Sequence, residues 1–291
     1  MYLHYVRPPP FLTDSLAGRQ KYLPKAGENM SIYITQKQRT NDPILVNFPT
    51  PFEQAPAVLV TPFWKGEGKS VGSIETVLTP VTTASCKISS GNQASNYWVN
   101  ILAIGPGEGG SAISLGNGER SVGKLGINSG VHAKMQAGQT TINFADPLKS
   151  NDPVVLLAPQ WTSPVGYTEC LVASAASEIS TYSGNMASGG TYSIDYLAAD
   201  RGASSFKDST TDFTQIETGT YNKTGSGIYR VYFQSPFSAP PVVFLSSWWN
   251  GTQGNLGSIE TILDVTNEYF DAISGNAASN YFVNWMAFGN T

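Results

Sequence analysis

The sequence predicts an all-β protein built from three related β-sandwich repeats. The prediction rests on the composition, on an internal repeat with three copies, and on the apolar patterning inside each copy. Charged residues make up only 13% of the 291-residue chain and hydrophobic residues 41%, and the chain holds 29 glycines and 18 prolines. This composition is typical of many short strands joined by polar turns, and it argues against a coiled coil or a disordered chain.

The charge balance and the short apolar runs bear on the expected partners. The formal net charge is −4, and the Lys and Arg residues are scattered along the chain. Protein surfaces that bind nucleic acids concentrate basic residues to neutralise phosphates. Because the basic residues here form no such cluster, we expect no nucleic-acid partner. No apolar run approaches the roughly 18 residues of a membrane span, so membrane insertion is not expected. The amino-terminal sequence lacks the apolar core of a signal peptide, which favours a cytoplasmic or unconventionally secreted protein.

The internal repeat is defined by motifs that return in one fixed order. A turn motif, Ser-Gly-Asn-x-Ala-Ser, begins at residues 90, 183 and 274. A second motif, whose best copies read Gly-Ser-Ile-Glu-Thr, occupies residues 72–78, 166–172 and 257–263. A third consists of a short apolar run after a proline, at residues 57–60, 154–157 and 242–245. Such an order, found three times, is very improbable by chance.

Within one repeat, short apolar bursts are bounded by Gly, Pro, Asn and Ser. Tyr229, Val231 and Phe233 alternate with Arg230 and Tyr232, which is the signature of a strand. We count five or six such strands per repeat and no convincing helix, which indicates a small antiparallel β-sandwich. The predicted organisation is an amino-terminal arm (1–22), repeats at 23–105, 124–202 and 213–291, and linkers at 106–123 and 203–212.

The third repeat resembles the H-type lectin domain, the fold of snail agglutinin and of the second domain of discoidins. The resemblance rests on the order and spacing of four segments, at residues 216–219, 231–245, 265–270 and 283–289. It extends over residues 23–289 and is strongest in the third repeat. It implies six-stranded antiparallel sandwiches arranged as a pseudo-threefold trimer within one chain. It also implies binding of galactose or N-acetylgalactosamine in clefts between neighbouring repeats.

The turn motif lies just before the last strand, where the resembled family places a sugar-contacting loop. Its asparagines are the first candidates for recognising sugar hydroxyls, together with the polar and aromatic residues that follow them. These candidates are Asn92, Asn96, Tyr97, Asn185, Tyr192, Asn276, Asn280 and Tyr281. An alternative is that Gly-Asn only makes the turn and that the asparagine caps its own backbone.

The in-register glutamates Glu75, Glu169 and Glu260 form the second set of candidates. A carboxylate can accept hydrogen bonds from two adjacent sugar hydroxyls. The alternatives are a solvent-facing strand residue or a hydrogen bond at an interface between repeats. Three equivalent glutamates would lie near one another only if they faced the threefold axis.

Aromatic and glycine positions complete the candidate site. Trp64, Trp161 and Trp249 lie four residues after the apolar runs of the third motif, at the ends of the strands that these runs predict. Their rings could stack on a sugar. We favour the interpretation that they fill the seams between repeats. In the resembled family the first strand of the domain also contributes to the cleft. The residues at those positions are Gly130, His132, Gly219 and Tyr221.

The sequence therefore predicts a non-catalytic, multivalent lectin that binds terminal sugars of glycoproteins or glycolipids. The arginine and the Trp-His pair of the family's sugar site are missing, so the specificity is expected to be of galactose type or altered. Enzyme activity is not expected, because glycoside hydrolysis needs paired carboxylates and each repeat offers one in-register acid. Two histidines and two cysteines give no metal-ligand spacing, and no cofactor is expected. The alternative is a structural or receptor-adhesion module; either protein could pair further into a homo-oligomer.

Overall fold

The computed structural model describes residues 30–66, 72–106, 111–113, 121–122, 125–186, 192–205 and 213–291. Within these ranges the chain forms strands and connecting turns and contains no helix, which confirms the all-β class. The predicted arm (1–22) lies outside the described residues, as do large parts of both predicted linkers. The described parts of those linkers hold three short strands, β7 (Ser111–Ile113), β8 (Ser121–Val122) and β15 (Gly202–Ser205).

Each repeat contributes six main strands in the same order. Repeat 1 contains β1 (Met30–Gln38), β2 (Ile44–Asn47), β3 (Ala57–Trp64), β4 (Thr76–Leu78), β5 (Ser85–Ser89) and β6 (Tyr97–Pro106). Repeat 2 contains β9 (Leu125–Ala133), β10 (Gly138–Asn143), β11 (Val154–Trp161), β12 (Cys170–Ser174), β13 (Glu178–Ser183) and β14 (Ser193–Ala199). Repeat 3 contains β16 (Gln215–Asn222), β17 (Gly227–Tyr232), β18 (Val242–Trp249), β19 (Thr261–Val265), β20 (Tyr269–Ser274) and β21 (Tyr281–Gly289).

The six strands of a repeat divide into two three-stranded halves. The outer half consists of the second, fifth and fourth strands, for example β2-β5-β4 in repeat 1. The inner half consists of the third, sixth and first strands, for example β3-β6-β1. All neighbours within a half are antiparallel.

The two halves of one repeat belong to different sheets. The outer half of repeat 1 continues into the inner half of repeat 2, that of repeat 2 into repeat 3, and that of repeat 3 into repeat 1. Each junction is a short parallel pairing, β4 with β11, β12 with β18, and β19 with β3. The expectation of purely antiparallel sheets confined to single repeats is therefore wrong. Sharing gives the fourth and third strands a neighbour at an edge that would otherwise leave backbone groups unpaired.

The apolar core, in contrast, forms between the two halves of the same repeat. In repeat 3, Val231 and Phe270 of the outer half pack with Leu245 and Trp285 of the inner half. The same arrangement in repeat 2 joins outer-half residues such as Ile179 to the inner half. Hydrogen bonding therefore links neighbouring repeats, whereas side-chain packing holds the halves of one repeat face to face.

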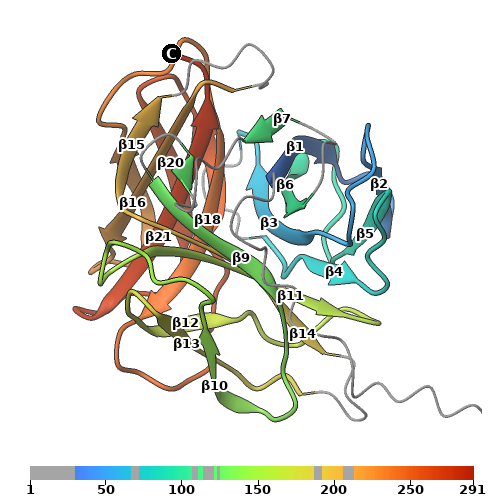
Figure 1. The fold of residues 1–291 in the computed structure, drawn as a ribbon. Helices are drawn as coiled ribbons and strands as arrows, with labels where there is room; N and C mark the ends of the chain where they lie inside the picture. Colours follow the sequence, from blue (N-terminus) through green and yellow to red (C-terminus); the bar gives the residue numbers. More distant parts are fainter. Residues whose placement is uncertain are drawn as a thin grey trace, which may run out of the picture.

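The third strands occupy the centre of the molecule. β3 and β11 are buried at all residues but the last, and both strands contact β18 and each other. Leu59, Leu156 and Phe244, one from each of these strands, belong to one central cluster. A strand buried on both faces reads as a continuous apolar run, as the sequence predicted for residues 57–60, 154–157 and 242–245. Figure 1 shows the three repeats, coloured blue to cyan, green to yellow and orange to red, each lying beside the other two.

We name the contact between two repeats that share a sheet a seam. Seam 1/2 joins the outer half of repeat 1 to the inner half of repeat 2, and seams 2/3 and 3/1 follow the same rule.

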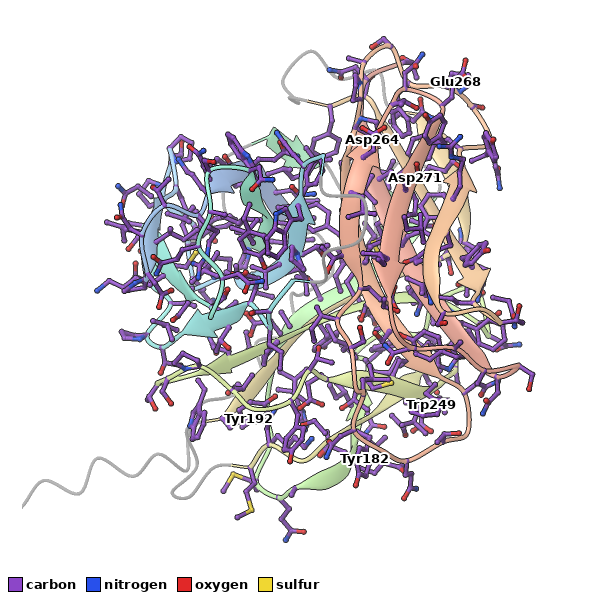
Figure 2. The ribbon with its side chains drawn as sticks, turned by 180° about the vertical axis from the view of Figure 1, so that it is seen from behind. Tyr182, Tyr192, Trp249, Asp264, Glu268 and Asp271 are labelled. Atoms are coloured by element: carbon purple, nitrogen blue, oxygen red, sulfur yellow. The ribbon has the colours of Figure 1, made fainter. Side chains whose placement is uncertain are left out.

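In the view from behind, the labelled acidic residues Asp264, Glu268 and Asp271 lie together at the far end of repeat 3 (Figure 2). The labelled aromatic residues Tyr182, Tyr192 and Trp249 lie at the opposite end of the molecule.

Candidate functional site

The three in-register glutamates lie inside the protein. Glu75, Glu169 and Glu260 are 3%, 1% and 4% exposed. Each carboxylate accepts a hydrogen bond from the tyrosine at the start of the last strand of its own repeat. The pairs are Tyr97 with Glu75 (2.8 Å), Tyr192 with Glu169 (2.6 Å) and Tyr281 with Glu260 (2.7 Å). Two sets of residues that the sequence predicted as separate ligand contacts therefore bind each other.

A basic side chain that the sequence analysis did not single out completes each cluster. The Nε atom of Arg39 lies 3.7 Å from Glu75 Oε2, and the Nζ atom of Lys134 lies 3.2 Å from Glu169 Oε1. Both basic side chains are fully buried. An unpaired charge inside a protein is very costly, so each cation is needed where it lies.

In repeat 3 the corresponding cation is Lys223. Its ammonium group donates to the backbone oxygens of Ser274 (3.0 Å) and Asn276 (2.6 Å), and its charge is attracted to Glu260. In all three repeats the basic residue follows the first strand and precedes the glutamate by 35 to 37 residues. This constant spacing is the signal that could have identified the cations from the sequence.

Burial sets the protonation properties of these clusters. It raises the pKa of Glu75 to about 7, against the opposing attraction of Arg39 and the hydrogen bond from Tyr97. Burial lowers the pKa of Lys134, although the charge of Glu169 opposes that change. The buried glutamates and basic side chains therefore interact with one another inside the protein and do not face solvent.

The turn asparagines extend the same clusters. Asn185 Nδ2 donates to the Tyr192 hydroxyl (3.1 Å) and to the backbone oxygen of Tyr167 (2.6 Å). Asn276 Nδ2 makes the equivalent bonds in repeat 3, to the Tyr281 hydroxyl (3.0 Å) and to Ser258 (2.9 Å). In repeat 1 the half-buried Asn92 hydrogen-bonds Tyr97. These bonds favour the structural interpretation of the turn, and a sugar contact by these side chains stays a prediction.

The three tryptophans pack on the same tyrosines. The ring centroids are 5.0 Å apart for Trp64 and Tyr97, 6.3 Å for Trp161 and Tyr192, and 6.1 Å for Trp249 and Tyr281. The indole N–H groups of Trp64 and Trp249 donate to Asn96 and Asn280, each at 3.3 Å. Each ring therefore contacts residues of its own repeat.

The glycine candidates on the first strands make room for aromatic rings. A Cβ atom on Gly219 would lie 2.5 Å from Trp285, and one on Gly130 would lie 3.1 Å from Tyr196. Tyr221 stacks on Tyr229 with the ring centroids 4.9 Å apart. His132 is partly exposed on β9, at a position opposite Ile194.

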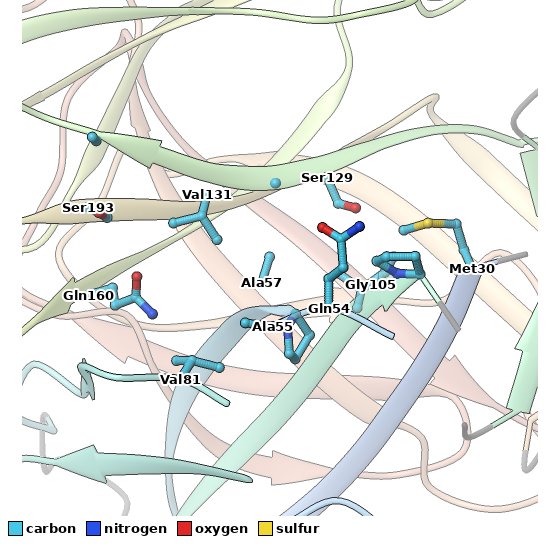
Figure 3. Close-up of a pocket in the computed structure, with 15 residues that line it drawn as sticks. Met30, Gln54, Ala55, Ala57, Val81, Gly105, Ser129, Val131, Gln160 and Ser193 are labelled. Atoms are coloured by element: carbon cyan, nitrogen blue, oxygen red, sulfur yellow. The ribbon is translucent and has the colours of Figure 1, made fainter. Parts of the chain in front are cut away.

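A cleft with a volume of about 350 Å³ lies between repeats 1 and 2. Repeat 1 lines it with residues that include Gln54, Pro56 and Val81, and repeat 2 with Ser129, Gly130, Gln160 and Ser193. Figure 3 shows Gln160 and Ser193 toward one end of the cleft and Gln54, Ser129 and Met30 toward the other. Of the sequence-predicted site residues, Gly130 is the one that lines this cleft. No described residue that lines it carries a charge or an aromatic ring.

A second, much smaller cavity lies where the third strands of all three repeats meet. Its volume is about 40 Å³, enough for one water molecule. Glu75 and Glu260 both line it, so two of the three glutamates do face a common centre. Across the described ranges, no group of three or more His, Cys, Asp or Glu side chains could hold a metal ion.

Comparisons with known proteins gave no match to any family model, to any curated protein or to any solved structure. The part of the chain that the structure describes contains no helix long and apolar enough to cross a membrane. Interpretation of the site therefore rests on its own geometry.

Proposed function

We propose that this protein is a non-catalytic carbohydrate-binding lectin whose three repeats form a pseudo-threefold platform related to that of the H-type lectins. The ligand is bound in a cleft between repeats. The observation that carries the proposal is the cleft at seam 1/2, which has the size of a small-molecule site and an uncharged lining. The cyclic sharing of sheets supports the pseudo-threefold part of the proposal.

The lining has the chemistry that a sugar requires. The side chains of Gln54 and Gln160 offer amide donors and acceptors, and Ser129 and Ser193 offer hydroxyl groups. Pro56 and other apolar side chains supply a wall for the less polar face of a sugar ring. Because the described residues of the lining include no charged or aromatic side chain, the expected ligand is a neutral sugar held mainly by hydrogen bonds.

A second candidate function is a structural or receptor-adhesion module on the same platform. The burial of the glutamates and the internal hydrogen bonds of the turn asparagines favour this alternative, because side chains committed to such bonds hold the fold whether or not a sugar binds.

A glycan array probed with the labelled, full-length chain separates the two functions. Binding to a subset of neutral glycans that free monosaccharide displaces is the result expected of a lectin. The heat-unfolded chain is the control for nonspecific adsorption. A blank array, repeated at high micromolar protein concentration, would refute the lectin proposal and leave the adhesion module.

A further inference from the structure

One pair of equivalent residues is aromatic at two seams and polar at the third. The polar pair lines the cleft between repeats 1 and 2. The residue that precedes the tryptophan at the end of each third strand is Phe63, Gln160 or Trp248. Its cross-strand neighbour on the last strand is Trp98, Ser193 or Phe282, respectively. Two repeats thus carry an aromatic pair at this point, whereas repeat 2 carries glutamine and serine.

At seam 2/3 the aromatic pair fills the space between the repeats. The ring centroids of Trp248 and Phe282 are 5.0 Å apart, and both rings pack with the core residues of repeat 2. The indole N–H of Trp248 also donates to the backbone oxygen of Val172, at 3.4 Å. The pair therefore closes this seam with side chains from one repeat seated against the other.

Seam 3/1 is closed in the same way. Phe63 and Trp98 of repeat 1 pack with the core residues of repeat 3. The ammonium group of Lys65 lies 5.1 Å from the centroid of the Phe63 ring and 4.1 Å from that of Trp98, so it covers both rings.

At seam 1/2 the smaller, polar pair leaves one of its groups unsatisfied. Gln160 is only 2% exposed and lines the cleft, and its Oε1 atom has no hydrogen-bond partner among the described residues. A buried amide oxygen without a partner carries a desolvation cost that a donor from a ligand would remove. Ser193, its cross-strand neighbour, lines the same cleft.

We infer that seam 1/2 is the ligand-binding seam of this protein, opened by the replacement of an aromatic pair with Gln160 and Ser193. Its ligand is a neutral small molecule that donates a hydroxyl or N–H hydrogen bond to Gln160 Oε1. The choice of a mono- or disaccharide as that molecule rests on the proposed function; the location and the polarity of the site do not. Seams 2/3 and 3/1 are closed, so the chain binds one ligand rather than three at these positions.

The test compares the wild-type chain with a variant in which the open seam is closed. Gln160→Phe with Ser193→Trp copies the pair of seam 3/1, and Gln160→Met keeps the size of the side chain while removing the amide oxygen. Thr141→Trp adds an aromatic ring at an exposed position of β10 and is the matched control. Saturation-transfer NMR measures binding of two probe sets, free neutral mono- and disaccharides, and a mixture of small neutral alcohols and amides.

We expect the wild type and Thr141→Trp to bind sugar alike, the closing variant to lose binding, and Gln160→Met to bind about ten-fold more weakly. If the closing double variant does not fold, Ser193→Trp and Gln160→Met carry the comparison. Sugar binding that survives in all cleft variants would overturn the assignment of the seam and leave the lectin function intact. Binding of the alcohols and amides alone, abolished by the closing variant, would keep the site and refute the sugar. No binding of either set to the wild type would overturn the inference.

Discussion

The backbone N–H of Val58 in repeat 1 donates a hydrogen bond to the Asp195 carboxylate of repeat 2, at 2.8 Å. Asp195 is completely buried, and its other oxygen, Oδ1, has no hydrogen-bond partner among the described residues. The equivalent residues of repeats 1 and 3 are Asn100 and Asn284. Asn100 Nδ2 donates to the backbone oxygen of Val243, at 2.8 Å, so an amide at this position can act as a donor across a seam.

Asp195→Asn should remove a pH dependence from the stability of the protein. Burial raises the pKa of Asp195 from 3.8 to about 8, although the Val58 hydrogen bond opposes that change. Between these values the folded protein keeps a proton that the unfolded chain releases, so stability falls as the pH rises from about 4 to about 8. We expect the variant to be about 1–3 kcal/mol more stable than the wild type above pH 8, because the asparagine stays neutral and can also donate.

Urea denaturation of both proteins between pH 4.5 and 8.5 measures this difference, and the gap should close toward the acidic end. Glu75, whose pKa is also raised, titrates in both proteins and cancels when the two curves are subtracted. Parallel stability curves would show that Asp195 does not titrate in this range.

The strands and their burial could be predicted from the sequence, but the division of each repeat between two sheets could not. The apolar runs at residues 57–60, 154–157 and 242–245 fall within β3, β11 and β18, since an apolar run signals a buried strand wherever it pairs. Because the apolar pattern is the same in every repeat, it is equally compatible with strands that pair within one repeat and with strands that pair with those of a neighbouring repeat. The parallel junctions depend on edges that meet only after the chain has folded.

The contacts among the candidate residues could not be read from the sequence. The turn asparagines, the glutamates and the tyrosines stand out there as repeated positions, but the hydrogen bonds that join them do not, and their binding of a sugar stays a prediction. Arg39 and Lys134 differ in type and directly follow the first strands of their repeats, far from the glutamates in sequence, so no local motif joins them to Glu75 and Glu169. The cleft at seam 1/2 was not predicted from the sequence. Repeat 2 has Gln160 and Ser193 where the other repeats have an aromatic pair, and no motif marks these two residues as the lining of a cleft.

Lys134→Met should destabilise the protein by about 3–5 kcal/mol, because it leaves the buried Glu169 carboxylate without its cation. The hydroxyl groups of Ser183 and Tyr192 would remain as hydrogen-bond donors to that carboxylate. Lys87→Met, at an exposed position of β5, is the control and should change the stability by less than about 0.5 kcal/mol. Adding Glu169→Gln to Lys134→Met should recover part of the loss. Equal urea midpoints for the two lysine variants would contradict a structural role for the ion pair.

Gly219→Ala should cost about 1–3 kcal/mol through overpacking. The added Cβ would lie 2.5 Å from the Trp285 ring, which also packs against Phe233 and Phe270 and has little room to move. Gly166→Ala is the matched control, because a Cβ at that glycine meets nothing within 4 Å. Denaturation midpoints and near-ultraviolet circular dichroism should both change in the first variant alone. An unchanged spectrum and midpoint would mean that the ring does not require the glycine.

The isolated third repeat, residues 213–291, should not fold as a monomer. Cutting it out removes β3 from the edge of its outer half and β12 from the edge of its inner half. The two halves could still pack on each other, but both would keep an open edge with unpaired backbone groups. Copies of the fragment can pair those edges with one another, since each offers the same outer and inner half, and a closed set of three would repeat the cyclic order of the intact chain.

We therefore expect a fragment that is largely unfolded at low micromolar concentration and gains β structure as it assembles. Circular dichroism and sedimentation velocity over a hundred-fold concentration range should show both changes together, with a trimer as the assembled species. The full-length chain is the control, and its folding should be independent of concentration because its three repeats are already joined. A fragment that is folded and monomeric throughout would show that the strands shared between repeats are dispensable for the stability of a single one.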